Sequence, residues 1–192
     1  MKKFILFLLV LFLACEPVTF AATQKTEKTA TEAEKADVKN GKAPKHSSET
    51  SKNENNFYKC AYYSVNLPAD WRAVLPPEER EGLVNAIFAR NTNSTVISLI
   101  IGPRGGADAK LIASMFAEQF KATKAPVEKN GQYFFSFNQK DALEQKTFVS
   151  TSCVSVSGDE FMITTWSGNQ KEAQKFLKDN IRSEHYSQLL PQ

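Results

Sequence analysis

The amino-acid sequence predicts an α+β fold, in which a largely antiparallel β-sheet of six to seven strands packs with two main helices. Three observations lead to this prediction. From residue 57 onward, short segments with alternating or continuous apolar residues recur between turn residues. Two further segments carry apolar residues at helical spacing. Most turns between neighbouring strands are too short for a parallel crossover, which favours antiparallel pairing.

The chain before residue 57 is expected to lie outside this domain. Residues 1–21 have the layout of a secretory signal peptide: Lys2-Lys3, an apolar run from Phe4 to Ala14, and small residues that allow cleavage after Ala21. The apolar run of eleven residues is too short to span a bilayer, which takes roughly 20 residues. Residues 22–56 contain seven lysines, six acidic residues and no aromatic residue, so we expect a disordered polar linker.

A second way of processing the N-terminus stays open. The segment Leu11–Cys15 resembles the lipobox of bacterial lipoproteins, in which Cys15 would be acylated and become the first residue. Ala14 fits that motif, whereas Phe12 stands where leucine is usual. Ordinary cleavage is the favoured interpretation. Both place the protein in the periplasm or cell envelope, with a membrane contact only through a lipid anchor at Cys15.

The single domain is expected to cover residues 57–192, and its first part reads as four strands. Tyr58 to Leu67 alternates like a half-buried strand, and Pro76 to Glu81 is expected to form a charged loop. Val96 to Ile101 is almost continuously apolar, which predicts a central strand buried on both faces. The expected strands are 58–67, 71–74, 83–90 and 96–101.

The second part of the domain begins and ends with a helix. Asp108 is the expected N-cap of the first helix, which carries Ile112, Phe116 and Phe120 on one face. Asn169 and Glu172 resemble a capping box that opens the second helix. Three strands are expected between the helices, at 132–138, 145–155 and 160–167. The last ten residues, 183–192, are expected to be a frayed tail.

This order of elements resembles the PsbP-like superfamily. The resemblance covers roughly residues 57–182 and is carried by the element order and by Leu67-Pro68-Ala69-Asp70-Trp71 at the end of the first strand. It implies a fold, an antiparallel sheet between helices, and no single shared activity, because members of the superfamily differ in function. It implies no cofactor and no binding residues for this chain.

Residues suited to catalysis are scarce in the domain. The only histidines are His46 in the linker and His185 in the tail, so no histidine-based triad or zinc cluster is expected in the core, and no catalytic, metal-binding or cofactor-binding residue is assigned. Glu78, Glu79 and Glu81 could serve a carboxylate-based hydrolase, but a charge run is more often a solvated surface. The net charge of +3 gives no basic field for nucleic acid.

Two local features are candidates for binding or cross-linking. Arg104-Gly105-Gly106 precedes a helix and could contact an anion or a partner, although a flexible turn is the simpler interpretation. In an exported domain, Cys60 and Cys153 are expected to form a disulfide; the alternative is two separate buried thiols.

The function expected from these observations is a non-catalytic binding or accessory module of the periplasm or cell envelope. Its partner would be another envelope protein or a small ligand, contacted through a face of the sheet or the 76–82 loop. The alternative is a hydrolase of the cell envelope that uses carboxylates alone.

Overall fold

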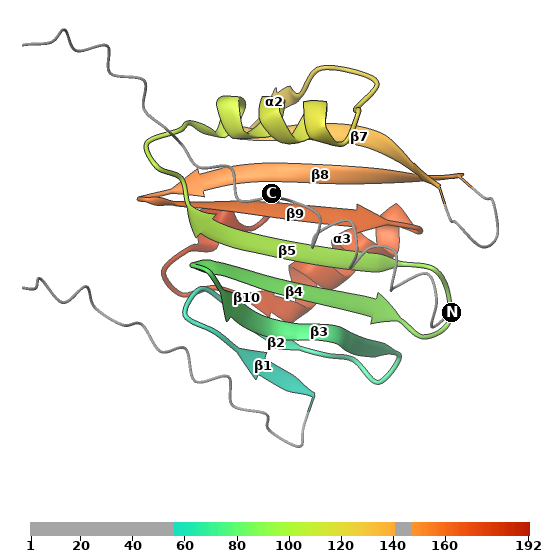
Figure 1. Cartoon of the computed structure of the whole chain (residues 1–192). Helices are drawn as coiled ribbons and strands as arrows, with labels where there is room; N and C mark the ends of the chain where they lie inside the picture. The colour runs from blue at the N-terminus through green and yellow to red at the C-terminus, as the bar shows by residue number, and fades with distance from the viewer. Residues whose placement is uncertain (1–55, 141–146) are drawn as a thin grey trace, which may run out of the picture.

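The computed structural model describes residues 56–140 and 147–192 (Figure 1). The expected signal peptide, Cys15, His46 and the linker up to residue 55 lie outside the described residues. The described part forms a seven-stranded antiparallel sheet, a three-stranded sheet and two helices, which confirms the α+β class.

The large sheet has the spatial order β3-β4-β5-β9-β8-β7-β6, and every neighbouring pair in it is antiparallel. Its strands are β3 (Trp71–Arg80), β4 (Leu83–Arg90), β5 (Val96–Pro103), β6 (Val127–Lys129), β7 (Gln132–Lys140), β8 (Thr147–Ser157) and β9 (Glu160–Ser167). Seven of the eight residues of β5 are buried, as expected for a central strand covered on both faces.

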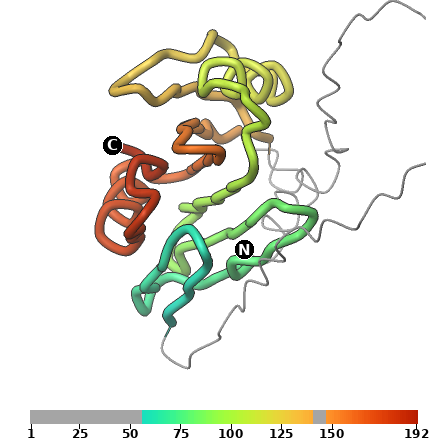
Figure 2. Tube along the Cα trace, turned by 90° about the vertical axis from the view of Figure 1, so that its left-hand side faces the viewer, coloured from blue at the N-terminus to red at the C-terminus, as the bar shows by residue number. Residues whose placement is uncertain are grey.

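Each face of the large sheet carries one helix. Helix α2 (Ala109–Gln119) packs on β7 and β8. The other face carries α3 (Gln170–Asn180), the short helical turn η1 (Ser187–Leu189) and the small sheet. The small sheet consists of β1 (Phe57–Lys59), β2 (Ser64–Asn66) and β10 (Ile181–Arg182). Figure 2 shows these layers edge-on, with α2 and α3 on opposite sides of the sheet.

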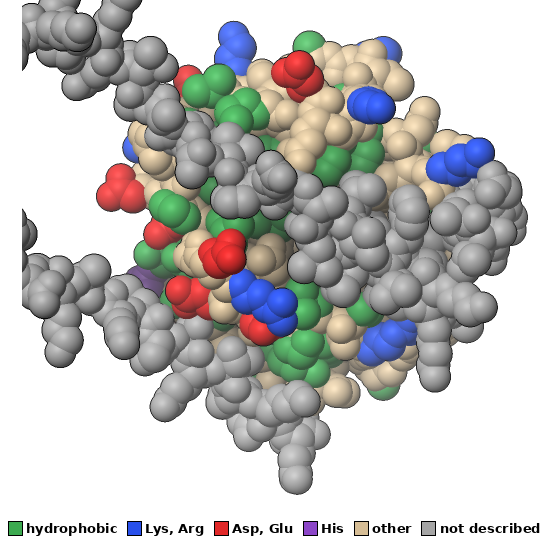
Figure 3. Space-filling view, in the orientation of Figure 1, with side chains coloured by type: hydrophobic (Ala, Val, Ile, Leu, Met, Phe, Trp, Pro, Cys, Tyr) green, Lys and Arg blue, Asp and Glu red, His purple; other side chains and the backbone are tan. Residues whose placement is uncertain are grey.

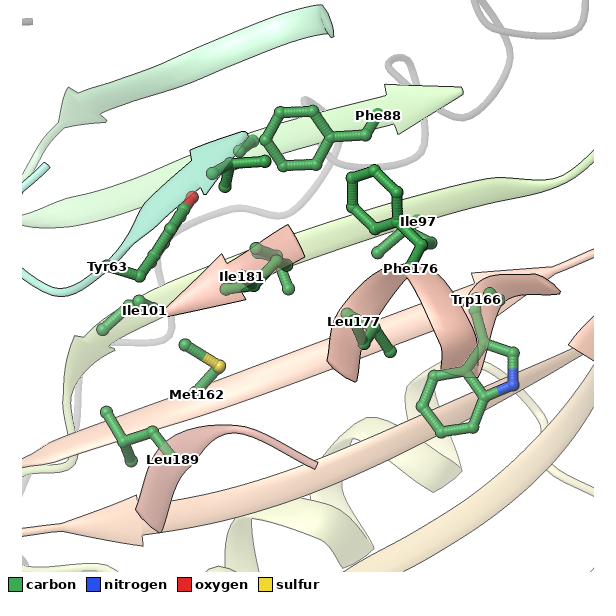
Figure 4. Packing of buried hydrophobic residues seen from close by; sticks show 14 of the residues in the cluster. Tyr63, Phe88, Ile97, Ile101, Met162, Trp166, Phe176, Leu177, Ile181 and Leu189 are labelled. Atoms are coloured by element: carbon green, nitrogen blue, oxygen red, sulfur yellow. The ribbon is translucent and has the colours of Figure 1, made fainter. Parts of the chain in front are cut away.

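The main hydrophobic core lies between the large sheet and α3. Phe176 of α3 stacks on Trp71 with ring centroids 4.0 Å apart and lies 5.9 Å from the ring of Phe88. Figure 4 shows Phe176 and Leu177 pointing from α3 toward the sheet, while Leu189 approaches from the C-terminal segment. All of these side chains except Trp71 are at most 5 % exposed, so this face is closed by a continuous apolar layer.

Both helices begin where the capping residues predict. Asp108 accepts a hydrogen bond from the Leu111 N–H at 2.7 Å, and the Asn169 side chain accepts from the N–H groups of Lys171 and Glu172. The predicted capping box is nevertheless only half correct, because the N–H of Asn169 donates to the Thr95 hydroxyl at 3.2 Å.

The carboxylate of Glu172 is used elsewhere, which explains the incomplete capping box. It pairs with Arg90 and accepts a hydrogen bond from Asn93 at 2.5 Å, while Arg90 also donates to Asp70 at 2.7 Å. These contacts tie the start of α3 to the end of β4 and the β4–β5 turn.

Three sequence predictions about local structure were wrong. The segment 58–67 is two strands, β1 and β2, because a loop at residues 60–63 turns the chain back and leaves Ala61 exposed. Residues 76–80 continue β3, since register shifts after Ala73 and Leu75 accommodate the two prolines. The C-terminal segment is docked, with Leu189 fully buried and the Gln132 side chain donating to the carbonyl groups of residues 188 and 190.

Candidate functional site

Strand register aligns the side chains on the α2 face of the sheet into rows that cross the strands. Residues that are paired across neighbouring strands lie side by side on the same face of the sheet. Following these pairs from strand to strand gives two adjacent rows through the middle of the sheet. The first row is Ile87, Ser98, Thr165, Ser152 and Phe135, and the second is Ala89, Val96, Ser167, Ser150 and Phe137.

Five hydroxyl-bearing residues in these rows form what we call the hydroxyl strip: Ser98, Ser150, Ser152, Thr165 and Ser167. All are at most 7 % exposed. The Ser152 and Thr165 hydroxyls lie 2.7 Å apart, and the Ser150 hydroxyl donates to the Gln139 side chain at 2.6 Å. The Ser98 hydroxyl is buried and has no hydrogen-bond partner among the described residues. Leaving such a group unsatisfied costs about 1–3 kcal/mol.

Apolar side chains border the hydroxyl strip on the β3 side. We call this group the β3–β5 patch: Val74, Leu75, Ile87, Ala89 and Val96. Ile87, Ala89 and Val96 are at most 4 % exposed. Within the described ranges, the residues packed against this cluster come from β3, β4 and β5 themselves, whereas α2 lies over β7 and β8 (Figure 1).

On its other side the strip meets the aromatic side chains under α2. Phe120 at the end of the helix stacks on Phe137 of β7 with ring centroids 4.7 Å apart, and the ring centroid of Phe135 lies 6.1 Å from that of Phe137. Phe116 bridges to Phe161 of β9 at 6.5 Å. The aromatic residues of 133–137 on this face therefore belong to the core beneath α2.

The two ends of this surface differ. At one end the side chain of Leu83 lies over Gly102, where a Cβ would come 2.3 Å from Leu83 Cδ2, and Phe161 closes the gap. At the other end Arg72 is paired with Ala89 and donates to Asn91 at 2.6 Å. The strip and the patch themselves contain no ionisable side chain. Figure 3 views the molecule from this side.

The predicted anion contact at Arg104-Gly105-Gly106 occupies the connection between β5 and α2. The Arg104 guanidinium donates to the carbonyl groups of Gly158 at 2.6 Å and of Ala107 at 3.2 Å. It thereby joins this connection to the β8–β9 turn. Gly105 and Gly106 are exposed with positive φ. An anion contact at these residues stays a prediction.

The predicted disulfide between Cys60 and Cys153 is not formed in the structure, where both cysteines are free thiols. Cys60 lies in the β1–β2 loop and its thiol donates to the Tyr63 carbonyl at 3.5 Å. Cys153 lies in the middle of β8 and donates to Gln132 at 3.5 Å. The loop that carries Cys60 joins two strands of the small sheet, whereas Cys153 lies in the large sheet, a separation that the sequence did not reveal. Burial raises the pKa of both thiols, that of Cys153 to about 12, which makes them weak nucleophiles at neutral pH.

The carboxylates considered for a hydrolase lie along the β3–β4 hairpin. Glu78 accepts two hydrogen bonds from Arg80, at 3.0 and 3.1 Å, and Glu79 and Glu81 are exposed beside it. None of the three belongs to the hydroxyl strip.

A pocket of about 380 Å³ lies elsewhere, against the C-terminal segment. Its lining is uncharged: Asn130, Gly131, Gln132, Ser155, Val156, Ser187, Gln188 and Gln192. The Gln132 and Ser155 side chains already bind the C-terminal segment through hydrogen bonds. This pocket therefore belongs to the contact between the C-terminal segment and the large sheet.

In the described ranges, no group of three or more His, Cys, Asp or Glu residues is arranged to hold a metal ion. None of the described helices is long and apolar enough to cross a membrane.

The sequence alone did not lead to a prediction of the hydroxyl strip. Serine and threonine at alternate positions of β8 and β9 look like ordinary solvent-facing strand residues. The available signal was Ser98, a single hydroxyl inside the otherwise apolar run 96–101. The rows become visible only when β5, β9 and β8 are aligned in register.

Comparisons with known proteins give no family for this chain. No protein-family model matches it, and no curated protein matches it. A solved structure from Bacteroides thetaiotaomicron VPI-5482 is similar, with 17% sequence identity, 65% of this chain and 46% of the other chain covered, and a TM-score of 0.42. This chain thus spans less than half the length of that protein. At this TM-score the likeness supports no argument about function.

Proposed function

We propose that this chain is an exported, non-catalytic binding module of the cell envelope whose binding surface is the hydroxyl strip together with the β3–β5 patch. The observation that carries the proposal is the buried, unpartnered hydroxyl of Ser98, placed between apolar residues on a half of the sheet that no described helix covers.

The chemistry of this surface favours an apolar segment of a partner protein. The strip and the patch carry no charge, so an ionised ligand would lose its hydration without gaining a counter-charge. Burying the aliphatic side chains of the patch stabilises a complex by roughly 25 cal/mol per Å². One hydrogen-bonding group on the partner would satisfy Ser98 and fix the register of the bound segment.

The width of the surface agrees with a helical partner. Strands lie about 4.8 Å apart, so the seven-stranded sheet is roughly 29 Å wide. A helix with its side chains is about 10–12 Å across, so α2 alone leaves room for one further helix on this face. The partner helix would lie beside α2, over β3, β4 and β5.

Export to the envelope is supported by the signal-peptide layout of residues 1–21. The resemblance of the Leu67–Trp71 segment and the element order to the PsbP-like superfamily agrees with a binding or accessory role, and membership of that superfamily is part of the proposal. Glu78 is paired with Asn85, two positions from Ile87, and so lies on the same face of the sheet, but its carboxylate is held by Arg80. This pairing favours binding over a carboxylate-based hydrolysis.

The experiment uses the chain without residues 1–21 and the uncharged apolar dye N-phenyl-1-naphthylamine. We expect saturable dye fluorescence that is weakened at least about tenfold, equivalent to 1.4 kcal/mol, by Ile87→Glu. The matched control is Leu111→Glu on the outer side of α2, where the side chain is 51 % exposed. Equal dye binding by the Ile87→Glu variant and the unaltered chain would show that the binding surface lies elsewhere.

A further inference from the structure

We propose that the outer side of α3 binds the surface of an anionic phospholipid membrane through four basic residues, which we call the basic stripe: Lys171, Lys175, Lys178 and Arg182. The basic stripe and the hydroxyl strip lie on opposite sides of the large sheet (Figure 2). This inference therefore concerns a separate surface and goes beyond the proposed function. A membrane contact through α3 would turn the α2 side of the sheet away from the bilayer.

The helical spacing of the three lysines places them on one line. Each residue of an α-helix advances about 100° around the axis, so positions 171, 175 and 178 lie within about 60° of one another. All three lysines are exposed. The buried residues of α3 fall on the opposite side of the helix: Ala173, Phe176 and Leu177. The lysines therefore project directly away from the core.

Arg182 follows the helix, but its side chain returns to the last turn. Its guanidinium donates to the carbonyl group of Lys178 and, at 2.9 Å, to that of Ile181. The last carbonyl groups of a helix carry partial negative charge and have no partner within the helix. These bonds hold the exposed Arg182 beside Lys178, where it extends the line of positive charge.

The acidic residues of α3 leave most of this positive charge in place. The hydrogen bond from Lys175, followed by the charges of the two cations after it, lowers the pKa of Asp179. Glu172 lies on another side of the helix, where it pairs with Arg90, and Glu184 belongs to the segment after the stripe. Four cations and the one carboxylate of Asp179 give a net charge of +3, as large as that of the whole sequence.

The lack of exposed apolar side chains on α3 favours a membrane over a protein partner. The large apolar side chains that are exposed among the described residues lie elsewhere: Phe57, Leu111, Val127 and Val149. The centre of a protein–protein interface is usually apolar and poor in lysine. An anionic bilayer attracts clustered lysine and arginine side chains through a diffuse surface charge, which requires no partner group at a fixed position.

The experiment measures binding to vesicles of equal parts phosphatidylglycerol and phosphatidylcholine. It uses the chain from residue 22 onward, which contains every described element. Cosedimentation at low salt should show binding that is lost on vesicles of phosphatidylcholine alone. The pair Lys171→Glu with Lys178→Glu should lower the partition coefficient at least about tenfold, because each basic group near an anionic surface adds to the attraction. Salt at about 1 M should abolish binding, since the Debye length falls to about 3 Å.

The matched control makes the same change of charge on the other side of the sheet. Lys110 lies in α2 and Lys121 follows its C-cap, and both are exposed. With α3 against the membrane, these lysines are farther from it than the Debye length of about 10 Å at moderate salt, so Lys110→Glu with Lys121→Glu should bind within about twofold of the unaltered chain. The milder pair Lys171→Gln with Lys178→Gln should give a smaller loss than the glutamate pair, and it decides the question if the glutamate pair does not fold.

Three results would overturn the inference. Equal losses in the α3 pair and the α2 pair would mean that binding follows net charge alone. Equal binding to both kinds of vesicle, or binding to neither, would mean that the stripe does not recognise an anionic membrane. Retention on immobilised polyglutamate without vesicle binding, abolished by the α3 pair, would assign the stripe to an acidic protein. In each case dye binding at the hydroxyl strip, which tests the proposed function, is measured separately and is unaffected.

Discussion

The two faces of the seven-stranded sheet use the same strands but are closed in different ways. On the α3 face, a helix, a small sheet and the C-terminal segment together cover a continuous apolar core. On the α2 face, one helix covers β7 and β8, and the described chain places no further element over β3 to β5.

The polar groups of the two faces show what this difference means. On the α3 face they hold the cover in place: Glu172 of the helix binds Arg90 and Asn93, and Asn169 binds Thr95. On the α2 face they lie in the floor of the sheet, and Ser98 has no described partner. Unpartnered buried polar atoms also occur on the α3 face, at Tyr63, Thr164 and Trp166. The difference between the faces is therefore the set of polar contacts that join α3 to the sheet, which has no described counterpart over β3 to β5.

The largest expected effect is a difference in unfolding free energy between substitutions in the core under α3 and substitutions in the β3–β5 patch. Phe176→Ala should lower the free energy of unfolding by about 3–5 kcal/mol, because it removes a ring stacked on Trp71 and leaves a cavity. In the chain without residues 1–21, Ile87→Ala should cost less than about 2 kcal/mol, near the lower end for a buried aliphatic residue, because its neighbours lie only within the sheet. Chemical denaturation measures both, and equal losses would mean that the two faces are equally closed.

An intermediate effect is expected at the junction between β9 and α3. Gly168 has a φ of +85°, and a Cβ there would meet the carbonyl oxygen of Ser94 at 2.7 Å. Gly106, with a φ of +81° and nothing within 4 Å of a Cβ, is the matched control. Gly106→Ala should cost about 1–2 kcal/mol from the left-handed backbone alone, and Gly168→Ala about 1–3 kcal/mol more from overpacking. Similar unfolding free energies for the two variants would show that α3 is not held as tightly as the geometry indicates.

The smallest effect is a pH dependence of the α3 attachment. The hydrogen bond from Arg90, followed by that from Asn93, lowers the pKa of Glu172. A carboxyl group whose pKa is lower in the folded state stabilises the protein above its unfolded pKa of roughly 4.3, and that stabilisation is lost as the pH falls through the folded value. The difference in unfolding free energy between the unaltered chain and Glu172→Gln should therefore be largest near neutral pH and shrink below roughly pH 4. Glu118→Gln on the exposed side of α2 is the control, and a difference that does not change with pH would contradict the attachment by Glu172.

Much of the fold was predictable because local signals agreed with the final structure. Asp108 and Asn169 cap the helices as expected, and the continuous apolar run 96–101 is the central strand. The errors fall where tertiary contacts override local preference. The two prolines at 76 and 77 remain in β3 because the strand pairs with β4 through register shifts. Leu189 is held by the core although the segment around it reads as a tail.

The candidate surface was less predictable for a physical reason. Its members come from β3, β4, β5, β8 and β9, which are up to about ninety positions apart along the chain, and each one alone is an ordinary strand residue. The disulfide prediction failed for the same reason, since strand pairing places the loop of Cys60 on the small sheet and Cys153 within the large sheet.

The sequence by itself determined the kinds of element, the two helix starts, the uncharged apolar strands and the scarcity of histidine in the domain, because hydrophobic period, capping and composition act over a few residues. Only the tertiary structure decided which strands are neighbours and that α2 covers half of its face. It also decided that five hydroxyl side chains, among them the unpartnered Ser98 hydroxyl, lie between an apolar patch and the aromatic residues under α2. These features depend on register between distant strands, and register is set by how the whole sheet packs against its covers.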